Sequence, residues 1–162
     1  MFPTDIGDLA RQVITAYTAR KIRLVTAESC TGGLIAGALT DVPGASAVVE
    51  RGFVSYSNEA KAEMLGVEPE VLEQFGTVSA RVAEDMARGA LNFSRADKAL
   101  SVTGIAGPDG GSAGKPVGLV FFGVATREGV VIHYQCHFTG SREAVRIEAV
   151  QEALRLLLSL VD

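Results

Sequence analysis

Residues 26–33 carry the side chains best suited to chemistry in this chain, in the run Thr-Ala-Glu-Ser-Cys-Thr-Gly-Gly. This run follows the apolar residues 22–25, which predict a strand, and precedes residues 34–39, which predict a helix. A turn between a strand and a helix directs backbone amides outward, where they can hold an anion. The same amides can stabilise an oxyanion beside a nucleophile. We therefore expect this turn to belong to a functional site.

Ser29 is the candidate nucleophile of this turn, because sites in open α/β sheets gather at the carboxyl ends of strands. The alternative is a turn serine that binds its own backbone or caps the following helix. Ala27 stands where the G-x-S-x-G elbow requires its first glycine, so that motif is absent. Cys30 is a rival nucleophile, and it ranks lower because no histidine motif could activate it. The base must therefore be a residue other than histidine.

Lys61 is the best candidate for that base, with Tyr56 as a proton relay or as a residue that orients the serine. Both lie where a predicted strand ends and a helix begins, and a lysine becomes a base when desolvation lowers its pKa. The alternative is a solvated helix lysine beside Glu59 and Glu63. Four residues separate Tyr56 from Lys61, so the pair is not the Tyr-x-x-x-Lys dyad of short-chain dehydrogenases.

The segment 104–118 is too rich in glycine for a simple connection, and its amides could hold a phosphate or a carboxylate. It has neither the Gly-Lys-Ser/Thr of a P-loop nor the helix that must follow a Rossmann fingerprint. Asp109 and Lys115 within it could bind substrate. The alternative is a flexible surface loop with solvated charges.

Arg142 and Arg146 lie one turn apart at the start of the last predicted helix, where positive charge opposes the helix dipole. This placement indicates an anionic partner such as a phosphate, or else ion pairs with Glu143 or Glu148. Glu28 could likewise orient a substrate amide or merely cap its turn.

The charge balance of the 162 residues, 15 basic against 19 acidic, argues against a nucleic-acid surface because no basic block is present. No apolar run approaches the roughly 20 residues that span a membrane. Cys30 and Cys136 form no zinc-ligand spacing, and we expect no metal or other cofactor. No signal peptide is evident, so the expected location is the cytoplasm.

The predicted elements follow the order α-β-α-β-α-α-β-β-β-α. Strands are expected over 22–26, 48–55, 98–103, 119–126 and 130–138, and helices over 5–17, 31–40, 58–65, 69–75, 79–90 and from 141. Thr4 or Asp5, Ser57 or Asn58, Ser79 and Ser141 are expected helix caps. We expect one α/β domain over 1–162, a three-layer α/β/α sandwich with a mixed, mostly parallel sheet closed by an antiparallel hairpin.

Four motifs, taken together, resemble the CinA C-terminal domain family, the nicotinamide-nucleotide amidohydrolases, in the form of a stand-alone domain. The resemblance covers nearly the whole chain, and motifs in the same order are far more specific than any one of them. They are residues 26–33, 50–61, 104–111 and 115–118, completed by 138–142 and Arg146.

The resemblance implies hydrolysis of the carboxamide of nicotinamide mononucleotide to nicotinate mononucleotide and ammonia, in pyridine nucleotide salvage. We expect Ser29 as nucleophile, Lys61 as base with Tyr56 assisting, and the amides after Ser29 as oxyanion donors. Ser46 is a second candidate hydroxyl, and Thr103 could also reach the strand edge. The expected substrate contacts are Glu28, Thr31, Gly32, Gly33, Ser46, Asn58, Thr103, Gly104, Gly107, Gly110, Gly111 and Arg142.

The expected partner is a small-molecule nucleotide, with no nucleic acid and no membrane, and the 48% hydrophobic content favours a homo-oligomer. The alternative function is a non-catalytic nucleotide-binding or regulatory module, linked to competence or the DNA-damage response as the family's name suggests. Tight mononucleotide binding without turnover would favour that module, whereas clear turnover would favour the enzyme.

Overall fold

Five strands form a single mixed sheet in the order β2-β1-β3-β4-β5 in the computed structural model, which describes residues 1–162. β1 pairs in parallel with β2 and β3, and the hairpin of β4 and β5 continues the sheet in antiparallel fashion. The expected mixed sheet with its closing hairpin is confirmed, but its strand pairs are not mostly parallel, since two are parallel and two are antiparallel. The strands are β1 (Leu24–Glu28), β2 (Val49–Val54), β3 (Lys98–Gly104), β4 (Leu119–Thr126) and β5 (Val131–His137).

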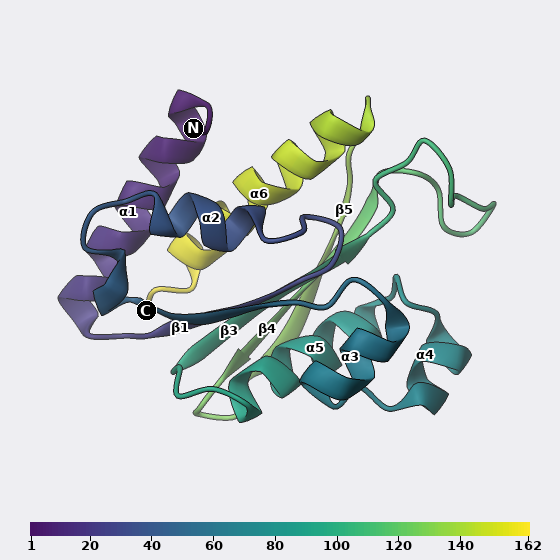
Figure 1. Ribbon diagram of the computed structural model, residues 1–162, viewed down its shortest axis with the longest axis horizontal. Coiled ribbons are helices and arrows are strands. Elements are labelled where there is room, and N and C mark those ends of the chain that lie inside the picture. The colour runs from purple at the N-terminus through teal and green to yellow at the C-terminus, as the bar shows by residue number, and fades with distance from the viewer.

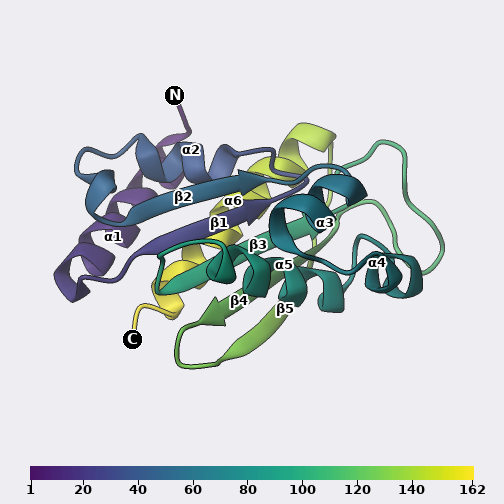
Figure 2. The same ribbon diagram turned by 60° about the horizontal axis from the view of Figure 1, so that its bottom comes forward.

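Helices cover both faces of this sheet, as Figures 1 and 2 show. One apolar core lies under α1 (Thr4–Arg20), α2 (Leu34–Thr40) and α6 (Arg142–Ser159). A second core lies on the opposite face under α3 (Asn58–Leu65), α4 (Pro69–Phe75) and α5 (Ala80–Asn92). These two cores confirm the three-layer arrangement. None of the helices has both the length and the apolar character needed to cross a membrane.

Serine side chains begin three of the helices, because each accepts a backbone N–H that the first turn would leave without a partner. Ser57 accepts from Ala60 at the start of α3, and Ser141 accepts from Ala144 at the start of α6. Ser79 does the same at the start of α5. The predicted cap of α1 was wrong, since Thr4 and Asp5 lie within the helix and Pro3 precedes it.

β1 continues to Glu28, two residues beyond its predicted end, because parallel neighbours on both sides supply backbone partners. Glu28 is in register with Val54 of β2 and with Val102 of β3. α2 in turn begins only at Leu34, since the residue before it, Gly33, has a left-handed φ of 97°. The turn between β1 and α2 therefore spans residues 29–33.

The close approach of α5 to the end of α3 depends on a glycine. A Cβ atom at Gly89 would lie 1.8 Å from the carbonyl oxygen of Leu65, so no side chain fits there. This contact fixes α3, and with it Lys61, against the rest of the helical layer. The absence of a side chain at Gly89 thus helps to position the candidate catalytic residue Lys61.

Candidate active site

Ser29 and Lys61 meet at the carboxyl edge of the parallel strands. Ser29 directly follows β1, and Lys61 lies in α3, which follows β2. The Lys61 Nζ lies 3.0 Å from the Ser29 Oγ. Both side chains are buried, Lys61 completely. The structure therefore brings the two residues singled out as nucleophile and base within hydrogen-bond distance.

Backbone carbonyls hold the Lys61 amine in place. Nζ donates to the carbonyl oxygen of Ser55 at 2.8 Å and to that of Tyr56 at 3.3 Å. Burial lowers the pKa of Lys61 from 10.5 to about 8, because desolvation disfavours the charged form. In the neutral amine two N–H bonds can stay on these carbonyls, which leaves the lone pair for the Ser29 hydroxyl. The arrangement suits a base.

Glu28 lies under the turn and holds the start of α2. Its buried carboxylate accepts from Thr31 Oγ1 at 2.7 Å and from the backbone N–H groups of Ile35 and Ala36, both at 2.9 Å. Negative charge is favourable at a helix N-terminus. The structure thus shows the capping alternative for Glu28, and neither Glu28 nor Thr31 lines the cavity beside Ser29.

A cavity of about 280 Å³ opens beside Ser29. Seven of the residues expected at the site line it: Ser29, Tyr56, Thr103, Gly104, Gly107, Gly110 and Arg142. Its wall also includes Cys30, Asp109 and two residues that no sequence motif indicated, Thr77 and Val78. The only sequence feature that could have indicated them is their position directly before Ser79, which caps α5.

Arg142 connects two walls of the cavity. One guanidinium nitrogen donates to the carbonyl oxygen of Gly107 at 2.9 Å, and another donates to the Tyr56 hydroxyl at 3.0 Å. Arg142 makes no ion pair, although Glu143 is its neighbour in sequence. The glycine-rich loop and the segment after β2 are thereby held at a fixed separation, with a positive charge between them.

Hydrogen bonds from threonine hydroxyl groups stabilise the opposite wall of the cavity. Thr77 Oγ1 donates to Asn58 Oδ1 at 2.6 Å, and Thr103 Oγ1 donates to the Thr77 carbonyl oxygen at 2.9 Å. Lys115 donates to the carbonyl oxygen of Phe75 at 2.7 Å and so fastens the glycine-rich loop to the end of α4. Asn58 lies outside the cavity and acts on its wall through Thr77.

The remaining candidates lie apart from the cavity. Ser46 precedes β2, at the end of the parallel strands opposite to Ser29, so it cannot replace Ser29 as the hydroxyl beside Lys61. Gly32 and Gly33 form the turn itself, and Gly111 lies further along the glycine-rich loop. Cys30 lines the cavity, but burial raises the pKa of its thiol to about 12, which keeps it protonated.

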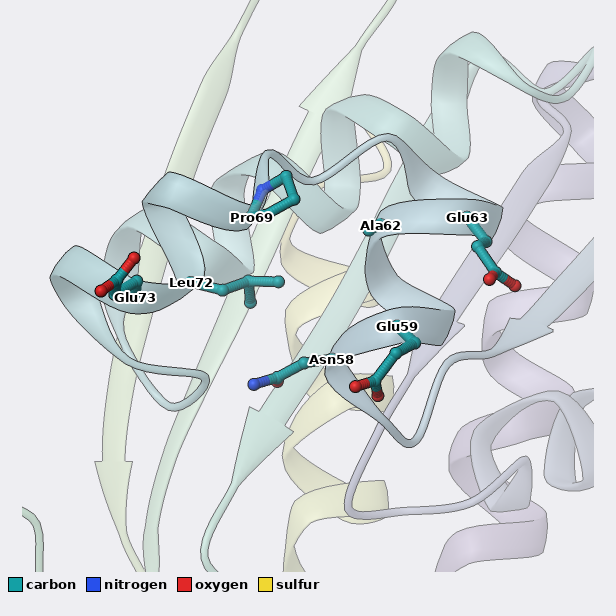
Figure 3. Close-up of a pocket in the computed structure, with 7 residues that line it drawn as sticks. All are labelled: Asn58, Glu59, Ala62, Glu63, Pro69, Leu72 and Glu73. Atoms are coloured by element: carbon teal, nitrogen blue, oxygen red, sulfur yellow. The ribbon is translucent and has the colours of Figure 1, made fainter.

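A separate hollow of about 420 Å³ lies between α3 and α4. Figure 3 shows the Asn58 and Leu72 side chains pointing into the space between the two helices, while Glu63 and Glu73 lie at opposite sides of the view. No group of three His, Cys, Asp or Glu side chains in the protein is placed to hold a metal ion. This hollow includes neither Ser29 nor Lys61.

Comparison with known proteins agrees with these motifs. A family model described as the CinA C-terminal domain matches residues 7–161. The chain is 52% identical over 157 residues to nicotinamide-nucleotide amidohydrolase PncC of Escherichia coli K12, covering 97% of this chain and 95% of that protein. It is 51% identical to a putative competence-damage inducible protein of Caldicellulosiruptor bescii, of which it covers 38%.

The fold is shared with solved structures as well. The crystal structure of competence/damage inducible protein CihA from Agrobacterium tumefaciens has a TM-score of 0.97 and 53% identity, and the match covers 100% of this chain and 99% of that one. A CinA superfamily protein from Klebsiella pneumoniae has a TM-score of 0.92 at 38% identity, with 96% of this chain and 97% of that one covered. On sequence and fold together, the chain belongs to the CinA C-terminal domain family.

Proposed function

We propose that the protein hydrolyses the carboxamide of nicotinamide mononucleotide, giving nicotinate mononucleotide and ammonia. The observation that carries the proposal is the buried Lys61 amine, 3.0 Å from the Ser29 hydroxyl at the edge of a cavity. A nucleophile beside a base of lowered pKa is what acyl transfer from an amide requires. Relatives of similar length that are 52% identical are named nicotinamide-nucleotide amidohydrolases.

In the proposed mechanism neutral Lys61 accepts the Ser29 proton while Oγ attacks the carboxamide carbon. The protonated amine then returns its proton to the leaving nitrogen, which departs as ammonia and leaves an acyl-serine ester. Water attacks this ester with Lys61 again as the base, and the acid product leaves as Ser29 regains its proton. Each proton that Lys61 accepts is returned within the cycle, so water is the only reactant besides the mononucleotide.

Negative charge that develops on the carboxamide oxygen needs donors close to Ser29. The backbone N–H groups of Cys30 and Thr31 directly follow Ser29, and they donate to no carbonyl or side-chain oxygen. We assign the Cys30 N–H to the oxyanion, because Cys30 lines the cavity whereas Thr31 is fully buried and does not.

The phosphate of the mononucleotide is assigned to Arg142, because a guanidinium forms strong charge-assisted bonds with phosphate oxygens. Arg142 lines the cavity and makes no ion pair with another residue. The Tyr56 hydroxyl, which accepts a hydrogen bond from Arg142, would orient the guanidinium, while only the backbone carbonyl of Tyr56 contacts Lys61.

Ammonia release from nicotinamide mononucleotide by the purified full chain tests the proposal. Turnover that is lost in Ser29→Ala and in Lys61→Ala is the expected result. Turnover that persists undiminished in both variants would contradict the assigned roles. Tight binding of the mononucleotide without turnover would instead favour a regulatory nucleotide-binding module, in line with the competence-damage names of some relatives.

We also propose that residues 1–162 act as one domain and that this domain forms a homo-oligomer. β2 is an edge strand, and Val54 and Tyr56 beside its end are 47% and 60% exposed. Such apolar surface at a strand edge favours association. Sedimentation equilibrium tests this, and a monomer at all concentrations would contradict it. A cytoplasmic location, proposed from the two free cysteines, is tested by cell fractionation.

A further inference from the structure

Arg146 lies one helical turn after Arg142 but faces a different part of the protein. Its Nε donates to the carbonyl oxygen of Cys30 at 3.0 Å, and its Nη2 donates to that of Thr31 at 3.3 Å. It is absent from the lining of the cavity and makes no ion pair, although Glu143 and Glu148 lie nearby in sequence. Its guanidinium therefore lies against the turn that carries Ser29.

These contacts fix the orientation of the peptide units after Ser29. In a planar trans peptide, the carbonyl of one residue and the N–H of the next point in opposite directions. The Cys30 carbonyl is held by Arg146, so the Thr31 N–H points away from the guanidinium. The Ser29 carbonyl accepts from the Gly32 N–H at 3.0 Å, so the Cys30 N–H points away from that bond. The orientation of the Gly32 N–H is in turn held by Arg146, because the Thr31 carbonyl of the same peptide accepts from the guanidinium.

We infer that Arg146 is a positioning residue for the oxyanion site, an inference that rests on the proposed amide hydrolysis. It holds the Cys30 and Thr31 carbonyls, and the Gly32 N–H of the second of these peptides holds the Ser29 carbonyl, which leaves the Cys30 N–H available beside Ser29. Its positive charge polarises the Thr31–Gly32 peptide, which strengthens the Gly32 N–H bond to the Ser29 carbonyl and, through it, the Cys30 N–H as a donor. Arg146 acts through the backbone and does not itself contact the substrate.

If Arg146 acts by positioning, its loss should lower kcat and leave KM nearly unchanged. Loss of one oxyanion donor lowers kcat by about 10²–10³-fold, whereas ground-state binding changes little. We therefore expect Arg146→Ala to lower kcat for nicotinamide mononucleotide by at least about 10²-fold, with KM within about threefold of wild type. Arg146→Lys should recover part of kcat, because an ammonium can still donate to these carbonyls.

Arg155→Ala is the matched control for the loss of an arginine from α6. Arg155 is exposed and pairs only with Glu152 on the same helix, at 3.6 Å. Its kinetic constants should equal those of wild type. A rise in KM with kcat unchanged in Arg146→Ala would overturn the inference and identify Arg146 as a phosphate ligand. If Arg146→Ala does not fold, Arg146→Lys carries the test: a reduced kcat with KM unchanged supports the inference, and wild-type kcat overturns it.

Pyridine-3-boronic acid provides a readout that needs no turnover. Its boron can accept the Ser29 Oγ as the proton passes to Lys61, which gives a tetrahedral boronate with an oxygen in the oxyanion position. We expect Arg146→Ala to weaken boronate binding by at least about tenfold, while binding of nicotinate mononucleotide stays within about threefold. Equal weakening of both ligands, or of neither, would overturn the inference.

The two readouts separate the inference from the proposed function. If wild-type protein releases no ammonia from the mononucleotide but its boronate binding depends on Arg146, the proposed function fails and the oxyanion role stands. If ammonia is released and Arg146→Ala matches wild type in both kcat and boronate affinity, the function stands and the inference fails.

Discussion

The Nζ of Lys61 lies 3.0 Å from the Oγ of Ser29, although 32 positions separate the two residues in the chain. Two carbonyl oxygens of the segment after β2 hold the remaining N–H groups of the amine. Lys61 has no carboxylate partner, so its amine is not part of a structural ion pair and can act as a base.

Replacing either residue of this pair should remove most of the activity. We expect Lys61→Met to lower kcat by about 10²–10⁴-fold, the usual contribution of a positioned proton-transfer group, and Ser29→Ala, which removes the nucleophile, to lower it by at least as much. Ammonia release from nicotinamide mononucleotide measures the effect. Glu63→Gln, an exposed change on the same helix as Lys61, serves as the control and should leave kcat unchanged.

The activity should depend on pH through Lys61. Because the base must be neutral and its pKa is lowered to about 8, kcat/KM should rise as pH increases through about 8 and then level off. A pH profile of kcat/KM from 6 to about 10 measures this. A profile that falls across the same range, or that is flat through pH 8, would argue against Lys61 as the base.

The free energy of unfolding should also depend on the protonation of Lys61. The pKa of Lys61 is about 8 in the folded protein and 10.5 when the side chain is solvated, so the unfolded state binds more protons between these values. The contribution of Lys61 to the free energy of unfolding should therefore rise from pH 8 to 10.5. Urea denaturation at several pH values measures it. In Lys61→Met this part of the rise should disappear.

Gly33 should be intolerant of a side chain because it begins α2 with a φ of 97°. Gly33→Ala should lower the free energy of unfolding by about 1–2 kcal/mol, the cost of left-handed backbone in an L-residue. Gly114→Ala is the matched control, since a Cβ there meets nothing within 4 Å and the backbone needs no positive φ. Equal stability of the two variants would show that the turn adapts.

Arg142 should act on the phosphate and not on the carboxamide. Arg142→Ala should raise KM for nicotinamide mononucleotide by about tenfold or more, the loss expected for a charge-assisted bond. Nicotinamide riboside, which has no phosphate, should be hydrolysed equally by the variant and by wild type. A similar loss for both substrates would place the role of Arg142 at the reacting end of the cavity.

Local patterns predicted much of the fold and part of the site. The serine caps at positions 57, 79 and 141 and the hairpin of β4 and β5 depend on neighbouring residues, so they could be predicted directly. The capping role of Glu28 could not be separated from a substrate contact, because the choice depended on how far β1 extends. Thr77 and Val78 carry no motif, so only packing shows that they line the cavity.

The sequence by itself determined the α/β order, the turn after β1 and the residue types of the reacting pair. The tertiary structure decided which side chains meet. Parallel pairing of β1 with β2 brings the ends of both strands to one edge, so Ser29 lies beside Lys61 while Ser46 lies at the other edge. Burial then sets the chemistry, because the low pKa of Lys61 and the protonated Cys30 both follow from desolvation. Solvent exclusion depends on how the whole chain packs, so it cannot be predicted from a local run of residues.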